Sequence, residues 1–495
     1  MLERQHIYVN IMSEQMKKKK RRTVIRNKRI WLVLLGSMAI LCILLCCLVF
    51  RLSNREADSA DREKAIIAER WEEDTDIVDE AEKEDLRQKT LQRDILCEDR
   101  GSKENVSTVD TGSSKKENGN VSIVDDESSS KEAEKTIKEK KTENNVRQAE
   151  IQKKIRSMSL AEKVAQMFII TPEFLTGYSN VTRAGEATKE ALNKYPVGGL
   201  IYMGANIKSE AQVTQMIQKQ QQYSQDRIGL PLFVSVDEEG GQVTRIASCD
   251  AITVPIFPDL FEIGTSLDGC SAYELGDAIG EYLSRMGFNL DFAPVADVLT
   301  NPNNTVVKRR SYGSDPKIVA EMVKENLDGL WKHQVYGCIK HFPGHGATAG
   351  DTHHGYAYTN KTWKELKNSD VIPFQESIQD GVSFIMVGHI SLPNVTKEDA
   401  PASLSSEVIN ELLREKLGYD GIVITDALNM GAVTQHYTTA QAAVQAVLAG
   451  NDILLMPADF KTAYEGIMNA VTDGVITEER LDESVGRILK VKFGL

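Results

Sequence analysis

The chain has 495 residues and a formal net charge of −13 at pH 7, which is enough length for two or three ordinary domains. Residues 151–495 account for −12 of that charge, so nucleic acid is not expected as a partner. Three of the seven cysteines fall in one apolar run and four are scattered, a pattern that indicates neither a disulfide framework nor a structural zinc site. No cofactor is expected.

A membrane anchor is predicted near the N-terminus. Residues 30–50 form 21 positions without a charge, close to the length of a membrane-spanning helix, and a basic block at residues 17–29 precedes them. The positive-inside rule predicts a cytoplasmic tail at residues 1–29, the cell membrane as a partner, and an extracytoplasmic location for the rest. A cleaved secretory signal is the alternative, although the run is long for one and no A-x-A site follows it.

Residues 51–150 are predicted to be a charged spacer. They contain 28 acidic and 19 basic residues with a single aromatic one, Trp71. Such a segment has too little apolar surface to offset the entropy lost on folding. A partly helical stalk at residues 63–93 is the alternative.

The remaining residues, 151–495, are predicted to fold as an α/β barrel of the TIM type, a closed ring of eight βα units. Short β-branched runs alternate there with longer amphipathic stretches, as expected when each strand is followed by a covering helix. The eight runs are residues 164–170, 197–202, 232–236, 290–294, 337–341, 384–387, 421–425 and 453–456. A doubly wound sheet would also alternate, but no glycine-rich dinucleotide motif follows the first strand.

Polar clusters follow the predicted strands closely. They are Asp237-Glu238-Glu239, Asp297, Lys340-His341, His389 and Asp426. In a closed barrel the carboxyl ends of all strands meet at one mouth, where enzymes with this fold have their active sites. The sequence therefore predicts one site built from these clusters.

A second group of polar residues lies ten or more positions beyond Lys340. Asp351 stands two residues before His353 in a glycine- and threonine-rich stretch, so its carboxylate can orient the imidazole and raise its basicity for acid/base work. Metal binding is the alternative, because His341, His345 and His354 lie nearby, but the spacing matches no standard zinc motif.

Asp426 ends an apolar strand as a lone carboxylate, the position expected of a rigidly held nucleophile. An N-cap of the following helix is the alternative.

Together these segments closely resemble the single-domain bacterial β-N-acetylglucosaminidases of glycoside hydrolase family 3. The matching motifs are Asp237-x-Glu239-Gly-Gly-x-Val-x-Arg245, Asp291-Phe-Ala-Pro-Val-Ala-Asp297, Arg310-Ser-Tyr-Gly313, Lys340-His-Phe-Pro-Gly-His-Gly346, Asp351-Thr-His353 and Thr425-Asp426-x-Leu428-x-Met430. The sequence departs from many relatives at Ala347, where an Asp is common, and at His354-Gly355-Tyr356.

The resemblance implies a role for each motif residue. Asp426 would be the nucleophile, and His353, oriented by Asp351, the acid/base; the product would keep its anomeric configuration. Larger family members take the acid/base from a second domain, which is not expected here. The groups that would bind the sugar hydroxyls are Asp237, Arg245, Arg310, Lys340 and His341.

The function expected from the resemblance is exo-hydrolysis of terminal β-linked N-acetylglucosamine in peptidoglycan fragments or related glycans. Three alternatives remain. A phosphorylase would use phosphate in place of water, since a neutral histidine tolerates an anionic acceptor better than a carboxylate does. A β-glycosidase could prefer another sugar, and a wall-binding protein could keep the barrel without the chemistry.

Overall fold

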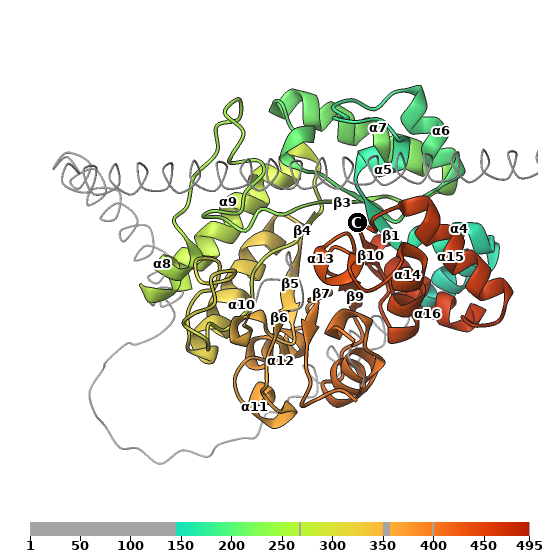
Figure 1. Ribbon diagram of the computed structural model, residues 1–495. Coiled ribbons are helices and arrows are strands. Elements are labelled where there is room, and N and C mark those ends of the chain that lie inside the picture. Colours follow the sequence, from blue (N-terminus) through green and yellow to red (C-terminus); the bar gives the residue numbers. More distant parts are fainter. Residues whose placement is uncertain (1–144, 267–268, 350–356, 398–399, 495) are drawn as a thin grey trace, which may run out of the picture. The chain divides into compact units, whose positions relative to one another are not determined.

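The computed structural model describes residues 145–266, 269–349, 357–397 and 400–494. Eight parallel strands form one sheet in the order β10-β1-β2-β3-β4-β5-β7-β9. A parallel bridge between Ile424 and Ile453 joins the two outer strands, so the sheet closes into a barrel (Figure 1). The strands are β1 (Phe168–Ile170), β2 (Gly199–Ile201), β3 (Phe233–Val236), β4 (Leu290–Asp291), β5 (Tyr336–Phe342), β7 (Phe384–Val387), β9 (Ile422–Thr425) and β10 (Leu454–Leu455).

Helices surround the barrel strands, as expected of βα units (Figure 1). The α-helices are α4 (Leu160–Gln166), α5 (Pro172–Thr176), α6 (Glu186–Lys194), α7 (Glu210–Ile228), α8 (Leu260–Thr265), α9 (Gly269–Met286), α10 (Pro316–Lys332), α11 (Trp363–Lys367), α12 (Ile372–Gln379), α13 (Gly431–Thr434), α14 (Thr439–Ala449), α15 (Phe460–Thr472) and α16 (Glu478–Lys492). Tighter or wider helical turns are η1 (Gly204–Asn206), η2 (His345–Ala347), η3 (Ala402–Leu404) and η4 (Glu407–Lys416).

The predicted TIM-type barrel is confirmed, and closure of the sheet excludes the doubly wound alternative. The first predicted strand is too long, because residues 164–166 belong to α4. Ser159 and Glu162 form a reciprocal capping box that starts this helix, since each side chain accepts a hydrogen bond from the other residue's backbone. An apolar run of this length does not by itself distinguish a strand from a buried helix end.

A small two-stranded sheet, β6 (Ala357–Tyr358) with β8 (Ile390–Ser391), lies outside the barrel sheet. Ala349 and Tyr358 exchange two backbone hydrogen bonds of 3.0 Å. The chain on either side of residues 350–356 is therefore held together at one place. We call this pairing the 349/358 clasp.

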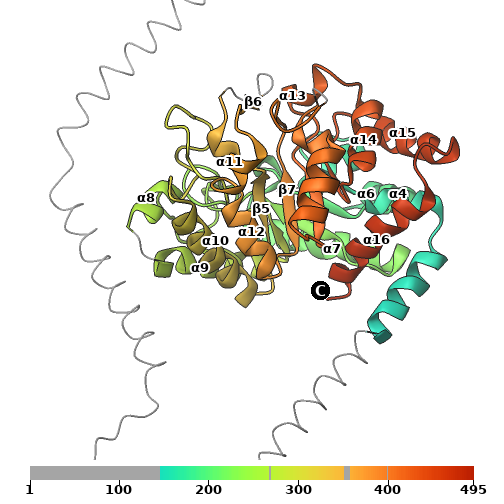
Figure 2. The same cartoon turned by 90° about the horizontal axis from the view of Figure 1, so that it is seen from below.

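A helix at residues 145–157 brings the chain to the barrel. Its Ile151 and Ile155 are buried in a separate apolar cluster against Leu230, Val485 and Leu489. Figure 2 shows this helix and the C-terminus on the side of the barrel opposite α13 and β6. Within the described ranges no helix is long and apolar enough to cross a membrane, and the predicted anchor (30–50) and most of the predicted spacer lie outside those ranges.

Lys492, near the end of α16, closes the same side of the barrel with a buried ammonium group. Its Nζ donates to Gln166 Oε1 (2.9 Å), Gly198 O (2.8 Å) and Pro231 O (2.6 Å), three acceptors just before β1, β2 and β3. It also lies 4.9 Å from the centre of the Phe233 ring. Burial lowers the pKa of Lys492 to about 7.

Replacing Lys492 with methionine is expected to change how stability depends on pH. Between about pH 7 and 10 the unfolded chain keeps the Lys492 proton and the folded chain loses it, so the free energy of unfolding should rise with pH through this group. Urea unfolding of wild type and Lys492→Met at several pH values measures the difference. Equal slopes for the two proteins across this range would contradict the assignment.

Candidate active site

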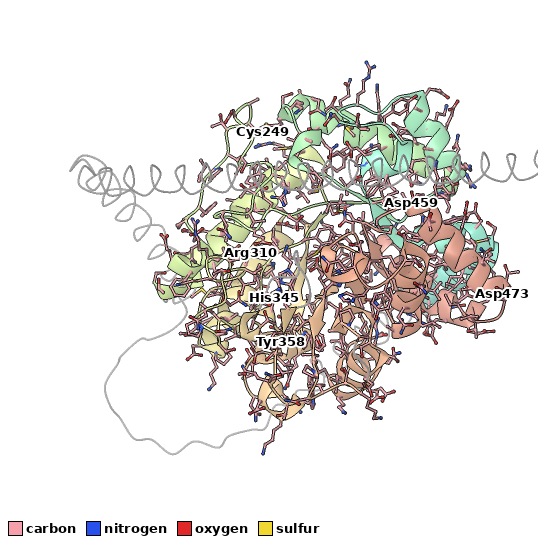
Figure 3. All side chains as sticks on the ribbon, in the orientation of Figure 1. Cys249, Arg310, His345, Tyr358, Asp459 and Asp473 are labelled. Carbon is pink, nitrogen blue, oxygen red and sulfur yellow. The ribbon has the colours of Figure 1, made fainter. Side chains whose placement is uncertain are left out.

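The six predicted site residues that the structure describes are linked around the carboxyl ends of the strands. Asp237 follows β3, Lys340 and His341 lie in β5, and Asp426 follows β9. Arg245 and Arg310 come from the loops after β3 and β4. Figure 3 shows Arg310 and His345 towards the centre of the barrel, whereas Asp473 lies at its edge. The predicted convergence of these residues is confirmed, while their roles stay predictions.

A β-bulge explains how two neighbouring residues of β5 both serve the site. Ile339 pairs with Ile385 and Phe342 with Val387, so β5 has one more residue than β7 over this stretch. In a regular strand consecutive side chains point to opposite faces, and a bulge changes that alternation. Lys340 and His341 therefore both make contacts inside the mouth.

Lys340 is the centre of a buried ion network. Its Nζ lies 3.0 Å from Asp237 Oδ1 and 2.7 Å from Glu239 Oε1, and its side chain is 3% exposed. Arg310 binds the same Glu239 with two parallel hydrogen bonds, Nε to Oε2 (2.8 Å) and Nη2 to Oε1 (2.7 Å). Two cations thus share one buried carboxylate.

The pKa values in this network follow from its charges. Burial alone would raise the pKa of Glu239, but Arg310 and Lys340 outweigh it and hold that pKa well below its ordinary value. Burial alone would lower the pKa of Lys340, but Glu239 and Asp237 keep it above the ordinary value. All three groups are therefore charged at neutral pH.

Glu238, between the two carboxylates that face the mouth, has a structural task. Its carboxylate accepts hydrogen bonds from the backbone N–H groups of Arg245, Ile246 and Ala247 and from the hydroxyl of Tyr282. These bonds fix the loop that carries the Arg245 side chain. Arg245 Nη2 lies 3.8 Å from Asp237 Oδ2, so the loop brings a cation to the partly exposed face of Asp237.

Asp291, at the end of β4, supports the same loop in a different protonation state. It is fully buried, and Oδ1 accepts a hydrogen bond from Glu238 N (2.9 Å). Burial raises the pKa of Asp291 well above its ordinary value, and the negative charge of Glu238 adds to the effect. Its side chain is therefore expected to be neutral at pH 7.

Asp297 holds the segment from His341 to His345. One oxygen accepts from the backbone N–H groups of His341 (3.1 Å) and His345 (2.6 Å), and the other lies 2.7 Å from His341 Nδ1. Burial alone would raise the pKa of Asp297, but His341 and His345 lower it. The charged Asp297 thus places the proton on His341 Nδ1 and leaves Nε2 turned towards the mouth as an acceptor.

Asp426 combines one held oxygen with one free oxygen. Ala427 N donates to Oδ1 (2.7 Å), and within the described residues no hydrogen bond reaches Oδ2. Burial alone would raise the pKa of Asp426, but His389 and His341, the Ala427 N–H and Lys340 lower it. The Asp426 carboxylate is therefore ionised at neutral pH.

His389 orients the strand end that carries Asp426. Its Nδ1 lies 2.6 Å from Ser403 Oγ and its Nε2 lies 3.0 Å from Ala427 O. Burial lowers the pKa of His389, so the neutral ring donates from Nε2 to Ala427 O and accepts from Ser403. The ring thereby fixes the peptide whose N–H holds Asp426.

The predicted acid/base pair, Asp351 and His353, lies outside the described residues. The 349/358 clasp lies between η2 of the Lys340 loop and β6, which pairs with β8 directly after His389. The segment that carries the pair is thus attached to the barrel beside the mouth. Among the side chains that the structure describes, no group of three or more His, Cys, Asp or Glu residues is arranged to hold a metal ion.

Three residues of the site were present in the sequence motifs but had no assigned task there. They are Glu239, Asp297 and His389. A signal existed for each, since Glu239 and Asp297 belong to quoted motifs and His389 follows a strand. What the sequence lacked was the pairing, because Arg310 and Glu239 are 71 positions apart and His341 and Asp297 are 44 apart.

Comparisons with known proteins give one family. The model described as "Glycosyl hydrolase family 3 N terminal domain" matches residues 159–491. β-Hexosaminidase A of Pseudoalteromonas piscicida is 32% identical over 333 residues, which cover 62% of this chain and 55% of that protein. This chain therefore spans little more than half of that relative.

Two solved structures are similar to this chain. A glycoside hydrolase family 3 β-N-acetylglucosaminidase from Paenibacillus sp. str. FPU-7 is 37% identical with a TM-score of 0.64, over 68% of this chain and 62% of that one. A β-glucoside phosphorylase, BglX, is 25% identical with a TM-score of 0.61, over 70% of this chain and 60% of that one.

Changing Glu239 to glutamine is expected to destabilise the protein by about 3 kcal/mol, because it leaves Lys340 and Arg310 buried beside each other without a negative charge. Urea unfolding measures this loss. The matched control is Glu281→Gln, which breaks an exposed ion pair with Arg285 and should cost less than about 1 kcal/mol. Similar losses in the two variants would show that the network contributes no more than a surface pair.

Proposed function

The chain belongs to glycosyl hydrolase family 3, and we propose that it is a retaining exo-β-N-acetylhexosaminidase that removes terminal β-linked N-acetylglucosamine. The observation that carries the proposal is the ionised Asp426, with one oxygen held and one free, next to a ring of charged groups suited to sugar hydroxyls. The names of the Pseudoalteromonas and Paenibacillus relatives support the same activity and the same sugar.

Asp426 acts as the nucleophile in this proposal. Its free Oδ2 attacks the anomeric carbon while the bond from that carbon to the leaving oxygen breaks, which gives a covalent glycosyl-aspartate. The rigid strand end and the Ala427 N–H fix the direction of attack. The low pKa of Asp426 keeps it ionised and makes it a good leaving group in the second step.

The sugar-binding groups surround the nucleophile with both donors and acceptors. Asp237 and His341 Nε2 accept hydrogen bonds from hydroxyls, whereas Lys340 and Arg245 donate to them. Lys340 and Asp237 are already paired, so each has its direction fixed before substrate arrives. We assign Arg310 mainly to Glu239, and through Glu239 it sets the position of Lys340.

Proton transfer is assigned to His353 with Asp351 as its orienting partner. In the first step His353 gives a proton to the leaving oxygen. In the second step it takes a proton from water as the water attacks the anomeric carbon and releases Asp426. Two displacements at the same carbon keep its configuration.

The acceptor in the second step is proposed to be water. Phosphate is the alternative, and the similarity to a β-glucoside phosphorylase keeps it open. The two acceptors give different products, since water releases free N-acetylglucosamine and phosphate gives a sugar 1-phosphate. A phosphate-dependent sugar 1-phosphate as the main product would overturn hydrolysis while leaving Asp426 as the nucleophile.

Mass spectrometry of protein treated with a 5-fluoro-N-acetylglucosaminyl fluoride is expected to find one sugar attached to Asp426. Asp426→Ala should remain unlabelled and lose roughly 10⁴-fold in kcat on a chromogenic β-N-acetylglucosaminide. Asp473→Ala, at an exposed carboxylate on the barrel edge (Figure 3), serves as the control and should retain full activity. A sugar on any other residue would sink the mechanism.

We further propose that residues 30–50 anchor the enzyme in the cell membrane and that its substrate is peptidoglycan. The spacer of about 100 residues supports this, because a flexible chain of that length has an end-to-end distance on the order of 50 to 60 Å. The membrane fraction of expressing cells should retain the full chain after carbonate washing, whereas a chain without residues 1–50 should be soluble. Release of the full chain by carbonate would contradict the anchor.

A further inference from the structure

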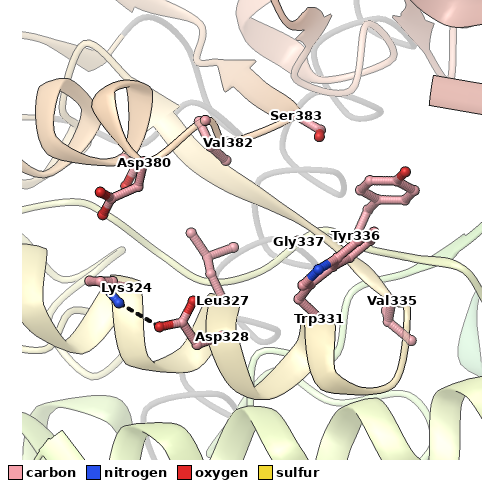
Figure 4. A pocket seen from close by; sticks show the side chains of 12 residues that line it. Lys324, Leu327, Asp328, Trp331, Val335, Tyr336, Gly337, Asp380, Val382 and Ser383 are labelled. Atoms are coloured by element: carbon pink, nitrogen blue, oxygen red, sulfur yellow. Dashed lines mark hydrogen bonds and ion pairs between the residues drawn. The ribbon is translucent and has the colours of Figure 1, made fainter. Parts of the chain in front are cut away.

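Two hollows meet at an exposed aromatic pair on the side of the barrel where the strands begin. One has a volume of about 340 Å³ and the other about 580 Å³. Both are lined by Trp331 at the end of α10, Tyr336 at the start of β5, and residues 381–383 before β7. We call the combined feature the basal groove. Figure 4 shows the smaller hollow, with Trp331 and Tyr336 next to each other.

The basal groove is separate from the active site. Its lining segments precede strands β5, β7 and β9, whereas the site residues follow the strands or lie at their ends. Tyr336 and Lys340 are four residues apart on β5, which is about 13 Å along the strand. A molecule bound in the groove therefore does not reach Asp426 through the barrel.

The groove combines an apolar platform with charged ends. Trp331 is 54% exposed, and its ring lies 5.1 Å from that of Tyr336 at an angle of 44°. Residues with both signs of charge line the two ends. They are Lys324, Asp328 and Asp380 in the smaller hollow, and Arg147, Asp420, Arg487 and Lys490 in the larger one.

We propose that the basal groove binds a second stretch of β-linked glycan. A sugar ring has an apolar face that packs on an aromatic ring, and its hydroxyl edge needs both donors and acceptors. Each hollow lies within the volume range of about 300 to 1,000 Å³ typical of small-ligand sites. The choice of glycan rests on the proposed function; the groove itself does not.

Other occupants fit the groove less well. The upstream residues 51–144 contain one aromatic residue, Trp71, and are densely charged, so they offer little apolar surface to cover Trp331. A partner protein would need an interface of about 1,000 Å² or more. Of the exposed large apolar side chains in the described part of the chain, Trp331 alone lines the groove, which is a small contribution to such an interface.

Binding at the groove would hold the enzyme on insoluble glycan without changing its chemistry. Attachment at a second point raises the effective concentration of chain ends around the catalytic mouth. The effect should be seen on polymeric substrate and be absent on a soluble monosaccharide derivative. This difference separates the groove from the active site in an experiment.

The test measures retention of the full chain on insoluble chitin and on purified peptidoglycan. An Asp426→Ala background prevents hydrolysis, and saturating free N-acetylglucosamine occupies the catalytic mouth. Trp331→Ala should reduce the retained fraction roughly three- to tenfold, because it removes the aromatic platform. Trp331→Phe should retain most of the binding, and Val475→Ala, an exposed apolar residue outside the groove, should match the parent protein.

A second variant covers the case in which Trp331→Ala folds poorly. Val382→Arg places a long charged side chain in the groove and leaves Trp331 in place, so it should also lose retention. In the active background both variants should keep the kcat/KM of wild type on the chromogenic substrate, which tests the proposed function independently. Retention equal to that of Val475→Ala would overturn the proposal, including the case in which the upstream segment or a second copy of the chain covers the groove, and so would failure of the parent protein to bind either polymer.

Discussion

The catalytic mouth depends on the placement of a lysine ammonium group between two carboxylates in a region that excludes water. A buried ion is costly unless its partners are close and well directed. Lys340 meets this condition through Asp237 and Glu239, which come from one turn after β3. Because Arg310 also binds Glu239, the turn after β3, the end of β5 and the loop after β4 have to take their positions together.

The same principle organises the second half of the mouth. Asp297 connects the loop after β4 to the bulged end of β5 through two backbone N–H groups and one imidazole. Glu238 does the same for the loop that carries Arg245. The carboxylates that touch loops are fully satisfied by hydrogen bonds, whereas Asp426 keeps an oxygen free. This contrast separates the supporting acidic groups from the proposed reacting one.

The barrel was predictable from the sequence because its two signals, strand periodicity and polar residues after strands, are local. The six site residues followed from the same rule, since consecutive strand ends meet in a closed barrel. The pairing of Glu239 with Arg310 and the bulge that turns both Lys340 and His341 inwards were not predictable, because they depend on contacts across the barrel. The start of β1 was misassigned because a buried helix end and a buried strand share the same composition.

The entry helix at residues 145–157 has a consequence for how the barrel is combined with other sequences. It reaches the fold on the side opposite α13 and β6 and is held by a small apolar cluster of its own (Figure 2). The Lys340 network makes no contact with that cluster in the described residues. The barrel is therefore a portable module: evolution or an engineer can exchange the leader in front of residue 145 without rebuilding the chemistry at the other end.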